Sequence, residues 1–229
     1  DLVAPATDIP TVSSGGTESA ACILPSGIPG IVRAYGTSMA AAQAAAGIAS
    51  MRLPLSVVQE KEPSAALLKA FVVNGAVDLS PGQYGEEDAE VPRAPNAVEG
   101  WGRLDLDAFT RTGSWIKVLD DTEGMRLGES RVYRIEVTTG SEMRVTLAWS
   151  DYPSLPEARL HLVNDLDIRL VDPEGNVYYP NNRSSRDPLN NVERIILDIE
   201  GKPGDYTIEL EAWNTPFSPQ PFALVAQVL

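Results

Sequence analysis

A serine stands at the start of an alanine-rich segment whose composition could activate it for chemistry. The segment reads Gly36-Thr37-Ser38-Met39-Ala40-Ala41-Ala42-Gln43-Ala44-Ala45-Ala46-Gly47. Alanine has the highest helix propensity, so a helix is expected from Ser38 to about Met51, and Leu53-Pro54 should end it. A helix N-terminus presents unpaired N–H groups and partial positive charge, which would stabilise an oxyanion formed at Ser38. Gly36 would let the backbone turn just before this nucleophile.

The same residues also fit a simple helix cap. In Gly36-Thr37-Ser38 either hydroxyl could accept a backbone N–H, and from these residues alone the cap is the better interpretation. A serine also needs a neighbouring base to become a nucleophile. The chain's single histidine, His161, lies far along the chain in a segment without a βαβ pattern. Ala40 occupies the place of the second glycine of an α/β-hydrolase nucleophile elbow, so a Ser38–His161 pair is not expected.

Oxygen-bearing side chains gather in the second half of the chain. Asp165 and Asp167 alternate on one face of a predicted strand, next to Asn164. A second oxygen-rich group follows, comprising Asn181, Asn182, Asp187, Asn190 and Asn191. Carboxylate and amide oxygens are ligands for calcium, although Asp and Asn also populate solvated turns, the better interpretation for any single residue. Structural calcium at Asp165 and Asp167 is the resulting hypothesis.

The sequence changes character near residue 115. Before it, a second helix is expected over residues 64–74, because Pro63-Ser64 can start it, apolar residues follow at helical spacing, and Asn74-Gly75 can end it. After it, short apolar runs alternate with turns. Strands are expected at residues 131–137, 143–149, 166–171, 192–197, 206–212 and 222–228. These patterns predict two domains, residues 1–115 and residues 120–229, the second an antiparallel β-sandwich or jelly roll.

The strand ending at Val171 shows clean alternation between apolar and polar residues. Leu166, Ile168 and Leu170 are expected to face the core, whereas Asp167 and Arg169 are expected to face solvent. The full set of predicted core residues is Leu166, Ile168, Leu170, Ile195, Leu197, Ile208 and Leu210.

Composition narrows the classes of partner. The 229-residue chain carries a formal net charge of -14, and such an acidic surface repels phosphate backbones, so no nucleic acid is expected. No apolar run reaches the length of a membrane span, and the stretch from Met39 to Ala49 is too short, so no membrane association is expected. Cys22 is the only cysteine, which excludes an internal disulfide.

Three segments together resemble the subtilisin-like serine proteases. The segment from Gly36 to Gly47 resembles their nucleophile motif, and Asp1-Leu2-Val3-Ala4-Pro5 resembles the strand that precedes the nucleophile loop. Gly100-Trp101-Gly102-Arg103-Leu104-Asp105 resembles the element that closes the catalytic domain. The order and rough spacing of the three agree with the family. Residues 120–229 resemble the C-terminal jelly roll of its oxidation-tolerant alkaline branch, above all at residues 162–167 and 173–176.

The resemblance implies an α/β fold for residues 1–115, an incomplete subtilisin-like parallel sheet with helices, followed by an all-β jelly-roll sandwich. It implies a secreted, extracellular endopeptidase with Ser38 as nucleophile and a peptide or protein as substrate. Tyr35, Gly36 and Thr37 would line the substrate cleft. No cofactor is required for such chemistry, and the family's use of calcium for stability agrees with the hypothesis at Asp165 and Asp167.

The chain also departs from the family pattern. Ala42-Gln43 replaces the usual Pro-His pair, and Ala6 replaces the usual glycine after Ala4-Pro5. The family's catalytic Asp and His precede the serine, yet no histidine precedes Ser38. A missing N-terminal catalytic segment, or another chain, is therefore expected as the partner that completes the sheet, and the chain alone is expected to be inactive. The competing interpretation is a non-catalytic β-sandwich binding or structural module with an inert protease remnant.

Overall fold

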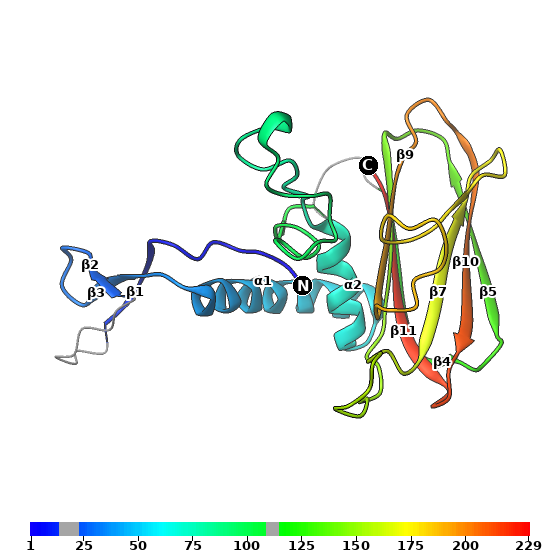
Figure 1. Cartoon of the computed structure of the whole chain (residues 1–229), viewed down its shortest axis with the longest axis horizontal. Coiled ribbons are helices and arrows are strands. Elements are labelled where there is room, and N and C mark those ends of the chain that lie inside the picture. Colours follow the sequence, from blue (N-terminus) through cyan, green and yellow to red (C-terminus); the bar gives the residue numbers. More distant parts are fainter. Residues whose placement is uncertain (14–22, 109–114) are drawn as a thin grey trace.

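The computed structural model describes residues 1–13, 23–108 and 115–229. Figure 1 shows a β-sandwich from which an arm projects. The arm consists of a long helix and, at its far end, a small antiparallel sheet of order β1–β3–β2. The strands of this small sheet are β1 (Ile9–Val12), β2 (Ile23–Pro25) and β3 (Ile31–Ala34).

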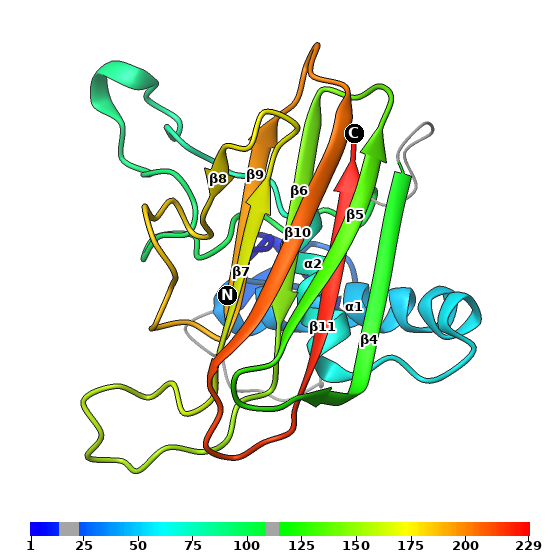
Figure 2. The ribbon, with the colours of Figure 1, turned by 90° about the vertical axis from the view of Figure 1, so that its right-hand side faces the viewer.

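The sandwich contains two four-stranded antiparallel sheets, ordered β5–β10–β7–β8 and β4–β11–β6–β9. Figure 2 views them with the first sheet in front. The strands are β4 (Trp115–Met125), β5 (Ser130–Val137), β6 (Glu142–Ala148), β7 (Asp165–Val171), β8 (Val177–Tyr178), β9 (Val192–Asp198), β10 (Gly204–Asn214) and β11 (Gln220–Val228). The six strands expected after residue 115 are thus confirmed in position, whereas β4 and β8 were not predicted.

Alternating apolar residues of the two sheets meet between them and form the sandwich core. Of the predicted core residues, Leu166, Ile168, Leu170, Ile195, Ile208 and Leu210 are buried in it. Leu197 packs partly buried against the same core. The expectation for the outer face of β7 is half wrong: Arg169 is exposed, but Asp167 is only 7% exposed. The loop between β8 and β9 covers Asp167 and brings Arg186 to it.

The expected fold class, an α/β unit with a parallel sheet followed by a jelly roll, is wrong. Among the described residues, all three sheets are antiparallel, and the only parallel pairing is an isolated bridge between Val3 and Arg103. In the arm, the short connection between β2 and β3 explains why these strands pair in the antiparallel direction. Only the short turn 26–30 links β2 to β3, and such a link allows antiparallel pairing, whereas parallel strands need a crossover of a dozen or more residues.

The long helix α1 (Thr37–Gln59) continues through Pro54, so the expected end at Leu53-Pro54 is wrong. A proline inside a helix removes one backbone hydrogen bond and crowds the preceding turn. Here Met51 and Leu55, on either side of the proline, are both buried in one apolar cluster with the second helix. Their packing holds the chain helical across the break.

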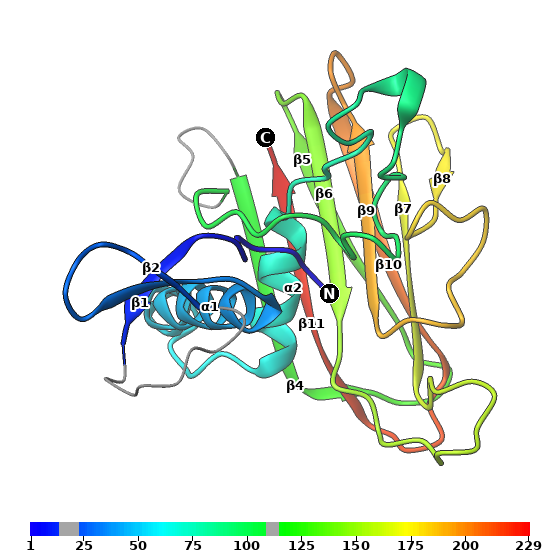
Figure 3. The same cartoon turned by 60° about the vertical axis from the view of Figure 1, so that its left-hand side comes forward.

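The second helix, α2 (Ala65–Gly75), fits its predicted range and packs against the sheet β4–β11–β6–β9, as Figure 3 shows. Arginines of the sheet bind its C-terminal end. Arg194 Nη1 donates to the carbonyl of Val73 at 2.9 Å, and Thr146 Oγ1 donates to Asn74 Oδ1 at 2.9 Å. Burial lowers the pKa of Arg194 to about 10. These contacts satisfy carbonyls that a helix end leaves unpaired, and they fix α2 to the sandwich. A 3₁₀ turn, η1 (Glu86–Asp88), follows in the next loop.

The N-terminus of α2 is capped from both sides. Ser64 Oγ accepts the N–H of Leu67 at 3.0 Å and donates to Asp120 of β4 at 2.6 Å. We expect Ser64→Ala to lower the free energy of unfolding by about 1–2 kcal/mol, because a cap is lost and the buried Asp120 loses a donor. Denaturant unfolding measures this. Ser50→Ala, an exposed serine of α1, is the matched control and should change stability by less than about 0.5 kcal/mol. Equal effects of the two variants would contradict the role of the cap.

Candidate functional site

Ser38 is the second residue of α1, which confirms the prediction that it lies in the first turn of a helix. Gly36 is the N-cap residue, so Thr37 and Ser38 lie inside the helix and not at its cap. Gly36 has a φ of 132°, a conformation that favours glycine. Its N–H donates to the carbonyl of Ala6 at 2.8 Å, which ties the start of α1 to the first segment of the chain.

The three segments that resemble a protease lie side by side. Val3 N–H donates to Gly102 O at 3.0 Å, and Leu104 N–H donates to Val3 O at 3.0 Å, so the first and third segments pair. The second segment joins them through Gln43, whose Nε2 donates to Pro5 O at 2.9 Å. Segments about a hundred residues apart in sequence therefore meet beside α1, the helix that carries Ser38.

Two glycines of these segments permit the close approach. A Cβ on Gly47 would lie 2.9 Å from the side chain of Leu106, which packs against α1. A Cβ on Gly102 would lie 2.4 Å from the carbonyl of Val77, and the φ of Gly102 is 119°. Any larger residue at Gly102 would therefore be strained by its backbone and blocked by its neighbour.

The surroundings of Ser38 are open. The four predicted site residues, which are consecutive in sequence, are all exposed: Tyr35, Gly36, Thr37 and Ser38. Only Gly47, Met51 and Leu55 of α1 are buried, while Leu53, Val57 and Val58 are each about 70% exposed. The helix that carries Ser38 is therefore largely exposed in this chain by itself.

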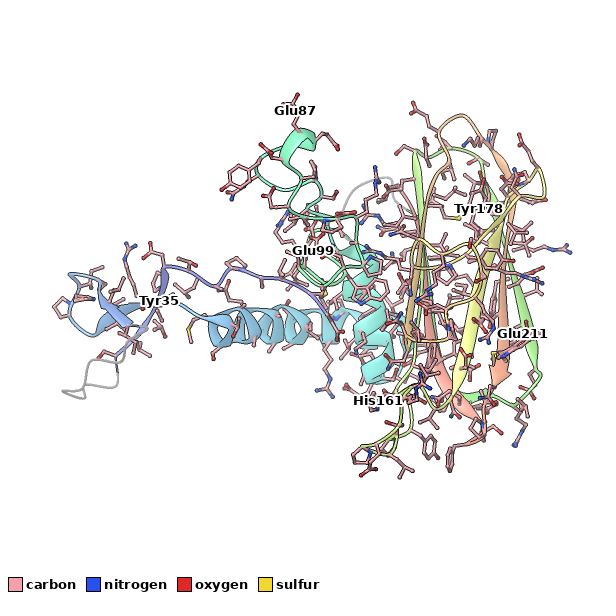
Figure 4. All side chains as sticks on the ribbon, in the orientation of Figure 1. Tyr35, Glu87, Glu99, His161, Tyr178 and Glu211 are labelled. Atoms are coloured by element: carbon pink, nitrogen blue, oxygen red, sulfur yellow. The ribbon has the colours of Figure 1, made fainter. Side chains whose placement is uncertain are left out.

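His161 lies apart from Ser38. It belongs to the loop between β6 and β7, where its Nδ1 shares a 2.8 Å hydrogen bond with Ser154 Oγ. Figure 4 shows His161 beside the sandwich and Tyr35 out on the arm. The nearby Asp151 accepts the backbone N–H groups of Tyr152, Val163 and Asn164, and so shapes the loop. The described residues thus supply Ser38 with no histidine base.

The predicted calcium residues have other partners. Asp165 accepts a hydrogen bond from Arg186 Nη1 at 2.6 Å. The guanidinium of Arg186 therefore lies where a calcium ion would have to bind this carboxylate. Burial raises the pKa of Asp165 despite this partner. In the second oxygen-rich group, Asn181 and Asn190 each donate to Asp187 at 2.6 Å, which closes the loop internally. Among the described residues, no group of three or more His, Cys, Asp or Glu is placed to hold a metal ion.

Helix α1 also bears on the expectation of no membrane association. By length and composition alone it is apolar enough to cross a bilayer, with a mean hydropathy of 1.2. It also contains Arg52 and Pro54. One helix of this kind is weak evidence, because a core helix of a soluble protein meets the same criterion. The absence of membrane association stays a prediction.

Comparison with known proteins gives a distant link to proteases. No protein-family model matches the chain. The "Serine protease/ABC transporter B family protein tagB" of Dictyostelium discoideum is 25% identical over 287 residues, covering 98% of this chain. The tagD protein of the same description and organism is 24% identical over 289 residues, again covering 98%. This chain spans 15% and 16% of those two proteins.

Solved structures are less similar. A protein from Sulfurospirillum deleyianum aligns with a TM-score of 0.30 and 8% identity, covering 52% of this chain and 99% of that one. A family GH115 4-O-methyl-alpha-glucuronidase aligns with a TM-score of 0.28 and 11% identity, covering 60% of this chain and 19% of that one. Scores this low carry no inference about fold or function.

Proposed function

We propose that this chain is the nucleophile-bearing, C-terminal part of a secreted subtilisin-like serine endopeptidase. The observation that carries the proposal is the meeting of the three resembling segments along the N-terminal half of α1, the helix whose first turn exposes Ser38. The distant similarity to two proteins named serine proteases supports the same class of reaction.

In the proposed mechanism, Ser38 Oγ attacks the carbonyl carbon of a peptide bond while a base takes its proton. The carbonyl oxygen, which becomes negatively charged, accepts a hydrogen bond from the backbone N–H of Ser38. The partial positive charge at the N-terminal end of α1 stabilises the same oxygen. The protonated base then donates to the leaving amine, and water hydrolyses the acyl-enzyme. Tyr35, Gly36 and Thr37 line the cleft on the leaving-group side.

The base in this mechanism comes from an upstream catalytic segment or from another chain. Such a partner would also cover the apolar side chains that α1 exposes, Leu53, Val57 and Val58. Burial of large aliphatic side chains is favourable, so α1 offers a surface on which a missing part of a catalytic domain could pack. Calcium at Asp165 and Asp167 stays a prediction, and no step of the mechanism depends on it.

The chain by itself is expected not to hydrolyse peptides, because none of the residues that the structure describes places a histidine base beside Ser38. The purified chain should leave casein intact, whereas the chain expressed together with its proposed upstream segment should degrade it. Release of acid-soluble peptides measures both. Turnover by the chain alone that is lost in Ser38→Ala would contradict the need for a partner. No turnover in the assembled protein, with both parts folded, would favour the competing non-catalytic binding module.

A further inference from the structure

The outer face of the β5–β10–β7–β8 sheet carries a cavity of about 490 Å³. The sheet lines one side of it, and the loop between β8 and β9 lines another. Its residues include Ser130, Asp167, Tyr179, Arg186, Glu211 and Trp213. Figure 4 shows Glu211 on this face of the sandwich, at the opposite end of the molecule from Tyr35. The cavity is therefore distinct from the site around Ser38.

Strand register places two carboxylates next to each other in this cavity. Glu211 of β10 pairs with Asp167 of β7 on one side and with Ser130 of β5 on the other. Residues directly opposite in an antiparallel sheet share a face, and like charges in such a pair are destabilising. Trp213, at a β-bulge of β10, lines the same cavity as Glu211 and is 51% exposed.

The cations around the cavity are already paired. Arg131 pairs with Asp121, Arg169 with Glu209, and Arg186 with Asp165. Glu211 has no cationic partner among the described residues. Asp167 lies 3.8 Å from Arg186 Nη1, beyond hydrogen-bond distance. The single guanidinium of Arg186 thus serves both Asp165 and Asp167, so the carboxylates here outnumber it, and Glu211 adds a further negative charge.

Asp167 is the more unusual of the two. It is 7% exposed, and neither of its carboxylate oxygens has a hydrogen-bond partner. Burial, together with the charge of Asp165, raises the pKa of Asp167 to about 7. A buried carboxylate without hydrogen bonds, whose cationic neighbour Arg186 also binds Asp165, is only partly stabilised when ionised, so a further cation brought close to it would be bound favourably.

We propose that this cavity binds the lysine or arginine side chain of a peptide. The cation lies between the carboxylate of Glu211 and the ring of Trp213. The negative charge of Asp167, which is buried in the cavity wall, attracts the same cation. Arg186 makes the same two kinds of contact in the adjacent position: its guanidinium lies 4.5 Å from the centroid of Trp213 and bonds Asp165 at 2.6 Å. The formal net charge of -14 attracts cationic peptides toward the molecule.

Calorimetric titration of the 229-residue chain with N-acetyl-arginine amide tests the proposal, and N-acetyl-citrulline amide serves as a neutral ligand of nearly the same shape. Only the arginine compound should bind saturably. Glu211→Gln should weaken binding by about tenfold, because a charge-assisted contact is lost. Trp213→Ala should weaken it as well. Both side chains are exposed, so both variants should fold. Glu136→Gln, an exposed carboxylate on β5 of the same sheet, is the matched control and should bind normally.

Three results would overturn the proposal. Equal binding of the citrulline compound would show that charge is not recognised. Unchanged affinity in Glu211→Gln would place the ligand elsewhere. Calcium that displaced the arginine compound, and whose own binding was lost in Glu211→Gln, would show a metal site instead. None of these measurements depends on Ser38, so the cavity and the proposed protease function succeed or fail separately.

Discussion

Replacing Ser38 by alanine in a protein that carries this chain with its proposed upstream segment should lower kcat for peptide hydrolysis by on the order of 10⁶-fold. The Oγ atom of Ser38 is the atom that would form the acyl bond, and no other described group stands in its place. Alanine is a strong helix former, so α1 and the neighbouring substrate contacts should persist and KM should change little. Steady-state kinetics with a chromogenic peptide measure both constants.

The matched control is Ser50→Ala, which changes an exposed serine of the same helix. Its Oγ donates only to the carbonyl of Gly47, and its loss should leave kcat unchanged. A Ser38→Ala protein with normal turnover would show that Ser38 is not the nucleophile. An equal loss of activity in both variants would instead indicate damage to α1.

Local signals were sufficient for most strands and for the second helix. Turn residues between short apolar runs indicated the positions of strands such as β7 and β9. They failed for β4, whose sequence includes the polar run Asp120-Asp121-Thr122-Glu123. Asp120 is buried there because it binds Ser64 at the start of α2, a partner that no local pattern reveals.

The exposure of acidic residues could not be predicted from alternation. Asp167 was expected on a solvated face, but the loop between β8 and β9 covers it. Glu193 is fully buried because its Oε2 accepts the N–H of Ile168, where β8 is too short to pair with β7. Burial raises the pKa of Glu193 well above its usual value. Both outcomes depend on segments distant in sequence.

In the candidate site, too, only the features that depend on local sequence could be predicted. The helix start at Ser38 could be predicted, because glycine and alanine determine local conformation. The exposure of α1 and the antiparallel arm could not, because they depend on which segments are present to pack or pair. The resemblance to a family indicated segments that do lie beside α1, namely those around Pro5 and Leu104, but it implied the wrong sheet.

Truncation of Ile168 to alanine should lower the free energy of unfolding of the sandwich by about 2–5 kcal/mol, because a fully buried aliphatic side chain leaves a cavity. Ile168 is 1% exposed and lies in the core between the two sheets. Ile196→Ala, at an isoleucine of β9 that is 42% exposed, is the matched control and should cost less than about 1 kcal/mol. Urea unfolding followed by tryptophan fluorescence measures both. Equal losses would mean that the register of β7 is wrong, whereas a loss at Ile168 alone would support the alternation that also brings Asp167 opposite Glu211.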